Sequence, residues 1–292
     1  MYIYNVVIFI IVLIVYSHIV FHKKENNDMD VYDIIDYMDH KFNDICDHRQ
    51  PVKFNSPIND IDELSMDSLL KTHNTFMINI RENNVKDDTF LYKGATLNSS
   101  FEECRTSTNT ICENNNTYMK ESGVYNYLFN IEKYLKPPLT TITTYDVMFG
   151  SENSKTPLRY EVSFRTFLLC RSGTIALKLT PPINRCYLDP ILDYENFEFR
   201  SDTDPWTLQQ SKTGASYIDV VLNPGECIYI PPYWWYSICY NNNDSLIYKV
   251  SYKTYMNVVT ILPYISMHYL QLMNIKYKIA PSLELKEDNI NK

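Results

Sequence analysis

The chain has 292 residues, 14% of them aromatic, and a formal net charge of -8 at pH 7. Its length suits one large domain or two small ones. Because the chain is acidic and lacks the basic footprint of a nucleic-acid binder, we expect no nucleic-acid partner. The abundance of Tyr, Asn and Ile, with only six Gly, is common in proteins from AT-rich genomes.

The first strong signal is an uncharged apolar run from Tyr2 to Phe21. About 20 helical residues span about 30 Å, which is the thickness of a bilayer's hydrocarbon core. No Lys or Arg precedes the run and no A-x-A pattern follows it, so an uncleaved membrane anchor over residues 1–24 is favoured over a signal peptide. A buried core helix is the third alternative.

Two signals disagree on which side of the membrane the rest of the chain faces. Lys23 and Lys24 follow the run directly and favour the cytosolic side by the positive-inside rule. Three N-x-S/T sequons suit a lumenal domain and are candidate glycosylation sites, at Asn98, Asn115 and Asn243. We give the lysines slightly more weight, because an Asn-rich chain produces sequons by chance.

Residues 25–74 are expected to form a linker and helices. The apolar spacing predicts one helix over Val31–Ile45 and a shorter one over residues 62–73. Thr75–Ile80 is predicted to be a strand, and Asn98–Asn116 a surface loop rich in Ser, Thr and Asn. An amphipathic helix over Val124–Pro138 is expected to end at its two prolines.

From about Leu158 the pattern changes to short β-rich runs that are separated by turn signals such as NPGE and NNND. Several short strands at this spacing predict an antiparallel sandwich or barrel, so the fold class is mainly β with flanking helices. We place this domain at residues 75–254.

Residues 255–292 are predicted to form two helices, split by Pro263, and a charged tail. A second membrane span is the rival interpretation, but Asn257, Pro263 and Gln271 argue against it. The broad apolar face of the helices predicts a homodimer through them. We expect His268 to be a packed or surface residue of this region.

Seven cysteines show no C-x-x-C spacing, which argues against a zinc cluster. Cys104 and Cys112 flank a polar segment and could pair in an oxidising compartment. Cys170, Cys227 and Cys239 lie in apolar strand patterns and are expected to pack as small hydrophobic residues.

Two segments carry a likeness to a known family: Thr156–Pro182, which begins with T-P-L-R-Y-E, and Tyr217–Ile238, in which strand, tight turn and strand lead to P-P-Y-W-W-Y. In this pattern the chain resembles the cupin-like, JmjC-type branch of the iron- and 2-oxoglutarate-dependent oxygenases, which includes asparaginyl hydroxylases. Similar cupin-like proteins occur in large DNA viruses. The resemblance implies a double-stranded β-helix. Since neighbours on a strand point to opposite faces, at most one of Trp234 and Trp235 would line its interior.

In that family, a His-x-Asp pair and a later His hold Fe(II) on one face and leave positions open for 2-oxoglutarate and oxygen. The resemblance places these three ligands at Arg159, Glu161 and Tyr236. Arg159 has no lone pair for a metal. An ordinary phenol such as that of Tyr236 titrates near about pH 10. We therefore expect no metal site and no catalytic residue, and we expect Arg159 to pair with Glu161.

The resemblance also places two 2-oxoglutarate-binding positions of the family in this chain. They fall at Thr156, which keeps the family identity, and at Ile175, where the family has a lysine. A chain with an isoleucine at the second position lacks the cation that would pair with the far carboxylate of 2-oxoglutarate.

The sequence therefore favours a membrane-anchored, cupin-like protein of a virion or host-cell membrane that has lost its Fe(II) and 2-oxoglutarate site. It would be a binding or structural module without a cofactor. The alternative is an active 2-oxoglutarate-dependent hydroxylase with unusual ligands. A lectin-like sugar binder, or another enzyme built in the barrel, is the third reading.

Overall fold

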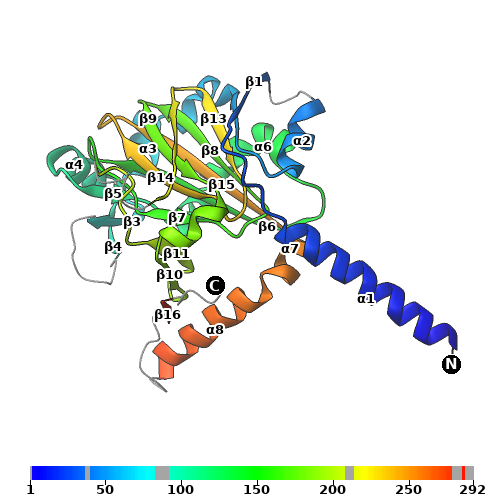
Figure 1. Cartoon of the computed structure of the whole chain (residues 1–292). Coiled ribbons are helices and arrows are strands. Elements are labelled where there is room, and N and C mark those ends of the chain that lie inside the picture. Colours follow the sequence, from blue (N-terminus) through cyan, green and yellow to red (C-terminus); the bar gives the residue numbers. More distant parts are fainter. Residues whose placement is uncertain (1, 37–39, 83–91, 208–213, 278–284, 287–292) are drawn as a thin grey trace.

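Two β-sheets pack face to face, and helices cover the outside of one of them (Figure 1). The computed structural model describes residues 2–36, 40–82, 92–207, 214–277 and 285–286. This is a mixed α/β architecture with two mainly antiparallel sheets, so the expected sheet-rich domain with flanking helices is confirmed at this level.

The larger sheet has nine described strands in the order β1-β2-β13-β8-β15-β6-β5-β3-β4, and only its β1–β2 pair is parallel among the pairs described. The strands are β1 (Tyr32–Asp36), β2 (Val52–Asn55), β3 (Met77–Glu82), β4 (Lys93–Thr96), β5 (Thr110–Cys112), β6 (Thr140–Gly150), β8 (Arg165–Ser172), β13 (Glu226–Ile230) and β15 (Leu246–Thr254).

The smaller sheet has seven described strands in the order β12-β9-β14-β7-β11-β10-β16, all paired in antiparallel fashion. They are β7 (Leu158–Tyr160), β9 (Ile175–Thr180), β10 (Pro190–Asp193), β11 (Glu198–Ser201), β12 (Ile218–Leu222), β14 (Trp235–Tyr240) and β16 (Leu285–Lys286).

The described helices are α1 (Tyr2–Lys23), α2 (His40–Asp47), α3 (Met66–His73), α4 (Leu97–Thr106), α5 (Asn116–Glu121), α6 (Phe129–Leu135), α7 (Tyr255–Thr260) and α8 (Leu262–Tyr277). The described residues also form four 3₁₀ helices: η1 (Pro57–Asp60), η2 (Asp62–Leu64), η3 (Val124–Leu128) and η4 (Pro182–Tyr187). Side chains of α2 to α6 pack with the nine-stranded sheet in one hydrophobic core.

The central strand β15 serves two cores, because its side chains alternate between the faces of the sheet. Tyr248 and Val250 belong to the core under the helices, whereas Ile247 belongs to the core between the sheets. The next two residues on the face of Ile247 are Lys249 and Ser251. The interior between the sheets therefore changes from apolar to polar along this strand.

The paired tryptophans point to opposite sides of their sheet, as the alternation rule predicts. Trp234 packs in the core between the sheets, together with Tyr236. Trp235 packs in a third core on the outer face, where Tyr264 and Ile265 of α8 lie against it. One tryptophan thus fills the interior and the other supports the C-terminal helix.

Two element predictions are wrong. Val31–Ile45 is not one helix but contains β1 and the start of α2, because β1 pairs with β2 in the sheet. Asn98–Asn116 is not a loop but contains most of α4, β5 and the start of α5, with Phe101 and Cys104 buried.

Two further expectations concern cysteines and the domain boundary. Cys104 and Cys112, which could pair in an oxidising compartment, are both free buried thiols in this structure. Because β1 and β2 join the larger sheet, that sheet begins before the expected domain boundary at residue 75.

α1 leaves the domain as a projecting helix (Figure 1). Among the described residues it is the one helix long and apolar enough to cross a membrane, and its apolar stretch is not buried. Its length and composition fit a membrane anchor or a signal sequence. Its last turn contacts the domain, because His22 is 5% exposed and its Nε2 lies 3.3 Å from Thr254 Oγ1.

Gly173, in the turn between β8 and β9, has a φ of +69°. A Cβ at this position would lie 2.6 Å from Ser245 Cα. We predict that Gly173→Ala lowers the free energy of unfolding by at least about 1–2 kcal/mol, because the left-handed backbone and the contact both disfavour a side chain. Denaturant unfolding in detergent, followed by circular dichroism, measures the change.

Gly94→Ala is the matched control. The Cβ of that variant would meet only Met77 Cε, at 3.4 Å, the end of a flexible side chain. We expect a change within about 0.5 kcal/mol for this site. Equal losses in the two variants would contradict the argument.

Candidate functional site

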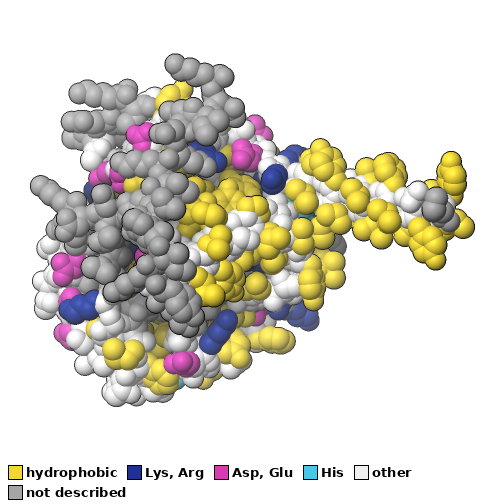
Figure 2. Space-filling view, turned by 90° about the horizontal axis from the view of Figure 1, so that it is seen from below, with side chains coloured by type: hydrophobic (Ala, Val, Ile, Leu, Met, Phe, Trp, Pro, Cys, Tyr) yellow, Lys and Arg dark blue, Asp and Glu magenta, His cyan; other side chains and the backbone are white. Residues whose placement is uncertain are grey.

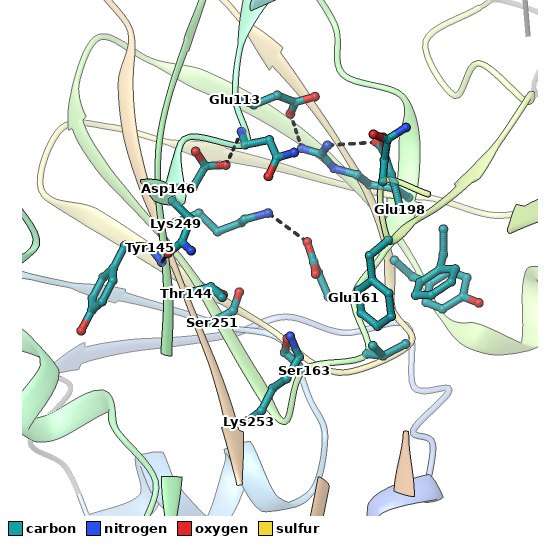
Figure 3. Close-up of a pocket in the computed structure, with 18 of the residues that line it drawn as sticks. Glu113, Thr144, Tyr145, Asp146, Glu161, Ser163, Glu198, Lys249, Ser251 and Lys253 are labelled. Atoms are coloured by element: carbon teal, nitrogen blue, oxygen red, sulfur yellow. Dashed lines mark hydrogen bonds and ion pairs between the residues drawn. The ribbon is translucent and has the colours of Figure 1, made fainter. Parts of the chain in front are cut away.

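A pocket of about 220 Å³ opens where the space between the sheets becomes polar (Figure 3). The larger sheet contributes Asp146 from β6 and both Lys249 and Lys253 from β15. The smaller sheet contributes Arg159 from β7 and Glu198 from β11. Charged side chains therefore fill this end of the interior, where apolar side chains would otherwise meet.

Four buried side chains form a closed set of ion pairs, here named the charge ring: Arg81, Glu113, Arg159 and Glu198. Arg159 Nη2 lies 2.6 Å from Glu113 Oε2, and Arg159 Nη1 lies 3.2 Å from Glu198 Oε1. Arg81 pairs with the same two carboxylates, with its Nη1 3.2 Å from Glu198 Oε2. None of the four residues is more than 9% exposed.

The two arginines keep the two carboxyl groups ionised. Burial by itself raises the pKa of Glu198, but Arg81 and then Arg159 outweigh burial and lower this pKa to about 2. Burial also raises the pKa of Glu113, and Arg159 and Arg81 again lower it overall. With both carboxylates ionised and both guanidinium groups protonated, the charge ring as a whole is neutral.

A second cluster lies beside the charge ring. Glu161 Oε1 accepts hydrogen bonds from Tyr236 Oη and from Lys249 Nζ, each at 3.0 Å. Burial, followed by the charge of Glu161, raises the pKa of Tyr236 to about 12, so the phenol keeps its proton and donates it to this bond. The Arg159 guanidinium lies 5.5 Å from the centre of the Tyr236 ring.

Lys253 also lines the pocket, and no carboxylate among the described residues forms an ion pair with it. Its Nζ lies 5.6 Å from the centre of the Phe197 ring. Figure 3 places Lys253 beside Ser163, away from the pair formed by Lys249 and Glu161. Burial lowers the pKa of Lys253, while the charge of Glu161 opposes this. The pocket therefore holds one positive group that is not neutralised by a neighbour.

The residues at the expected ligand positions do not fit Fe(II). Arg159 places a guanidinium, which has no lone pair, in the position of the first ligand. Tyr236 is a protonated phenol whose hydrogen bond goes to Glu161. The remaining candidate, Glu161, is bonded to Tyr236 and Lys249. Nowhere in the described ranges do three or more His, Cys, Asp or Glu side chains come together in a way that could hold a metal ion.

The two positions that correspond to 2-oxoglutarate binding serve the fold. Thr156 Oγ1 accepts from the backbone N–H of Ile238 at 2.9 Å, and Thr156 is 2% exposed. Ile175 is fully buried in the core between the sheets, at the register of Tyr240. In this structure neither side chain lines the pocket.

The expected pairing of Arg159 with Glu161 is corrected by the structure, because each finds other partners. Arg159 binds Glu113 and Glu198, and Glu161 binds Lys249. We did not anticipate these partners, nor Arg81, from the sequence. For Lys249 a signal existed, since the alternation of β15 places it on the interior face next to Ile247. For Arg81, Glu113 and Glu198 we find no local signal.

Burial makes Asn115 unsuitable as a glycosylation site. It is 2% exposed, and its side-chain amide donates to Val147 O at 3.1 Å. Asn98 is exposed on α4, and Asn243 is half-buried with its Oδ1 accepting from Glu152 N at 2.7 Å. Both remain predictions.

His268 packs on the domain as expected, with its Nδ1 2.6 Å from Tyr194 O.

We predict that Arg159→Met lowers the free energy of unfolding by about 3–5 kcal/mol, because two buried carboxylates would then face one guanidinium. Lys178→Met is the control. It breaks the pair of Lys178 with Asp219, whose side chain is 72% exposed, and should cost less than about 1 kcal/mol. Denaturant unfolding compares the two variants, and equal losses would show that the charge ring has no special role.

Comparison with known families supports the same fold. Residues 39–258, more than half of the chain, match the family described as cupin-like domain. No significant match is found among curated proteins. The matched range holds both sheets apart from β1 and β16, together with the pocket and all four residues of the charge ring. The chain therefore belongs to the cupin-like domain family.

Proposed function

We propose that the chain is a membrane-anchored cupin-like protein whose double-stranded β-helix has lost iron-dependent oxygenase chemistry and acts as a binding or structural module. The observation that carries the proposal is the state of Arg159. The resemblance assigns this residue to a metal-ligand position, and its guanidinium pairs with two buried carboxylates. A dication at this place would meet a fixed positive charge instead of a lone pair.

The proposed anchor is α1. Its apolar stretch is uncovered by the domain, which in water would expose a large hydrophobic surface. The two lysines that follow, Lys23 and Lys24, favour a cytosolic domain. Two observations support a virion or host-cell membrane as the location. The chain resembles cupin-like proteins of large DNA viruses, and its amino-acid composition is common in proteins from AT-rich genomes.

The test for lost oxygenase chemistry uses the full chain, extracted in detergent, loaded with Fe(II) without oxygen, and then given 2-oxoglutarate and oxygen. We expect less than stoichiometric bound iron by elemental analysis and no succinate from 2-oxoglutarate, because the ligand positions carry a guanidinium and a protonated phenol. Stoichiometric iron with succinate release would overturn the proposal in favour of an active hydroxylase with unusual ligands.

The binding role rests on the pocket that remains, where Lys253 is the unneutralised cation. We expect small anions such as inorganic phosphate or succinate to bind there and raise the melting temperature of the full chain in detergent. Lys253→Met should weaken this binding by about tenfold or more, a loss of at least about 1.4 kcal/mol.

Lys178→Met is the control for the anion test, because Lys178 lies outside the pocket and pairs with Asp219. This variant should bind the anions as the wild type does. Equal stabilisation of the wild type and of Lys253→Met, or no stabilisation of either, would contradict a role for Lys253.

A further inference from the structure

An uncovered row of apolar side chains follows α7 and α8. Its members, here named the α7–α8 stripe, are Tyr255, Val259, Leu262, Tyr269, Leu270 and Met273. Tyr255 and Val259 are about one turn apart on α7, and the four members on α8 fall within about 100° of one another around the helix. They are between 42% and 63% exposed. The described part of the domain therefore leaves this side open to its surroundings.

The first half of α8 contacts the domain with its opposite side, whereas Leu272 and Ile275, further along that side, are 40% and 42% exposed. Tyr264 and Ile265 pack in the core around Trp235, and His268 contacts Tyr194 O. The helix is thus held in place, and the α7–α8 stripe cannot turn inward without breaking these contacts.

The composition of this segment is unlike that of a solvated helix. Residues 255–277 contain no Asp or Glu, and their only lysine is Lys276. A helix that faces water on one side normally carries charged residues there. Contiguous apolar surface of this kind marks a contact with a membrane or with another protein.

The stripe begins where α1 joins the domain. Tyr255 directly follows Thr254, whose Oγ1 lies 3.3 Å from His22 Nε2 in the last turn of α1. In Figure 1, α1 and α8 both project below the domain, and Figure 2 shows hydrophobic side chains spreading over this lower face from the base of α1. The uncovered surface is therefore continuous with the proposed anchor.

A groove of about 640 Å³ extends this surface beside the base of α1. Leu139, which is 75% exposed, lies next to the stripe because Tyr255 N donates to Leu139 O at 3.2 Å. Lys133 and Lys136 of the α6 region line the same groove. Apolar and tyrosine side chains with lysines nearby are the composition of surfaces that rest in the headgroup region of a bilayer.

We propose that the α7–α8 stripe lies in the interface of the membrane that α1 crosses, so that α8 rests on the bilayer. The proposal rests on the anchoring role proposed for α1. A second copy of the chain could also cover an apolar helix. The membrane is favoured because the stripe starts at the anchor itself and because the lysines beside it suit lipid headgroups.

The test places a fluorescent label at single cysteines in the full chain. Cys186 is the exposed native thiol and is replaced by serine, whereas the other six cysteines are buried. New cysteines are made by Leu270→Cys in the stripe, by Leu13→Cys in α1 and by Glu102→Cys on α4. Glu102 is exposed, and α4 lies at the end of the domain opposite to α1 (Figure 1).

The labelled proteins are reconstituted in phosphatidylcholine vesicles that contain nitroxide-bearing lipids. We expect the label at position 270 to be quenched at least about twofold more than the label at position 102, since only the first would reach the headgroup region. Met273→Cys repeats the measurement with a second member of the stripe.

Each other outcome has a separate meaning. Quenching at position 13 without quenching at position 270 would overturn the interfacial position of the stripe and leave the anchor intact. A label at position 270 that lipid does not quench, together with thiol cross-linking between copies at this position, would show a dimer interface instead. Absence of quenching at position 13 would overturn the anchor and the inference that rests on it.

Discussion

The pairing of one guanidinium with two carboxylates decides the character of this site. Arg159 stands on the smaller sheet and binds Glu113, which directly follows β5 of the larger sheet. Arg81 on the larger sheet binds Glu198 on the smaller one. The charge ring therefore joins the two sheets at the end where their apolar core stops. The positive charge at this junction of the sheets is supplied by guanidinium groups of the chain itself.

The neighbouring cluster is paired in a similar way. Lys249 neutralises Glu161, and the neutral phenol of Tyr236 adds a hydrogen bond to the same carboxylate oxygen. The members of the charge ring, Glu161 and Lys249 each have an opposite charge as partner, which offsets the cost of their burial, whereas Asp146 accepts from the backbone N–H groups of Asn114 and Asn115. Lys253 lines the same pocket and has no ion pair among the described residues. Arg159, Glu161 and Tyr236 are all bonded to other side chains of the interior.

The strands with regular alternation could be predicted from the sequence, and so could the opposite orientations of Trp234 and Trp235. The proximity of Arg159, Glu161 and Tyr236 was expected from the resemblance, and Tyr236 contacts the other two. The partners of Arg159 could not be found in this way, because Glu198 and Glu113 lie 39 and 46 residues away with no motif around them. Such pairings depend on how strands from two sheets meet, which a single sequence does not display.

Composition misled the prediction at Asn98–Asn116. Ser, Thr and Asn are frequent there, but Leu97, Phe101 and Cys104 recur at helical spacing and are all buried. The helix start is also marked, since Thr96 Oγ1 accepts from Ser99 N at 3.3 Å. Val31–Ile45 failed for a different reason. Its first half forms a strand because β2 offers it an edge for pairing, a long-range effect that outweighs local propensity.

The contact between His22 and Thr254 joins the last turn of α1 to the end of β15. The imidazole also lies against the Phe164 ring, with the ring centres 5.1 Å apart and the planes tilted by 40°. Two side-chain contacts therefore tie the last turn of α1 to the domain. With α1 in a membrane, the pocket would stand at one height and in one direction relative to the bilayer, so it could meet only ligands that are presented from that side.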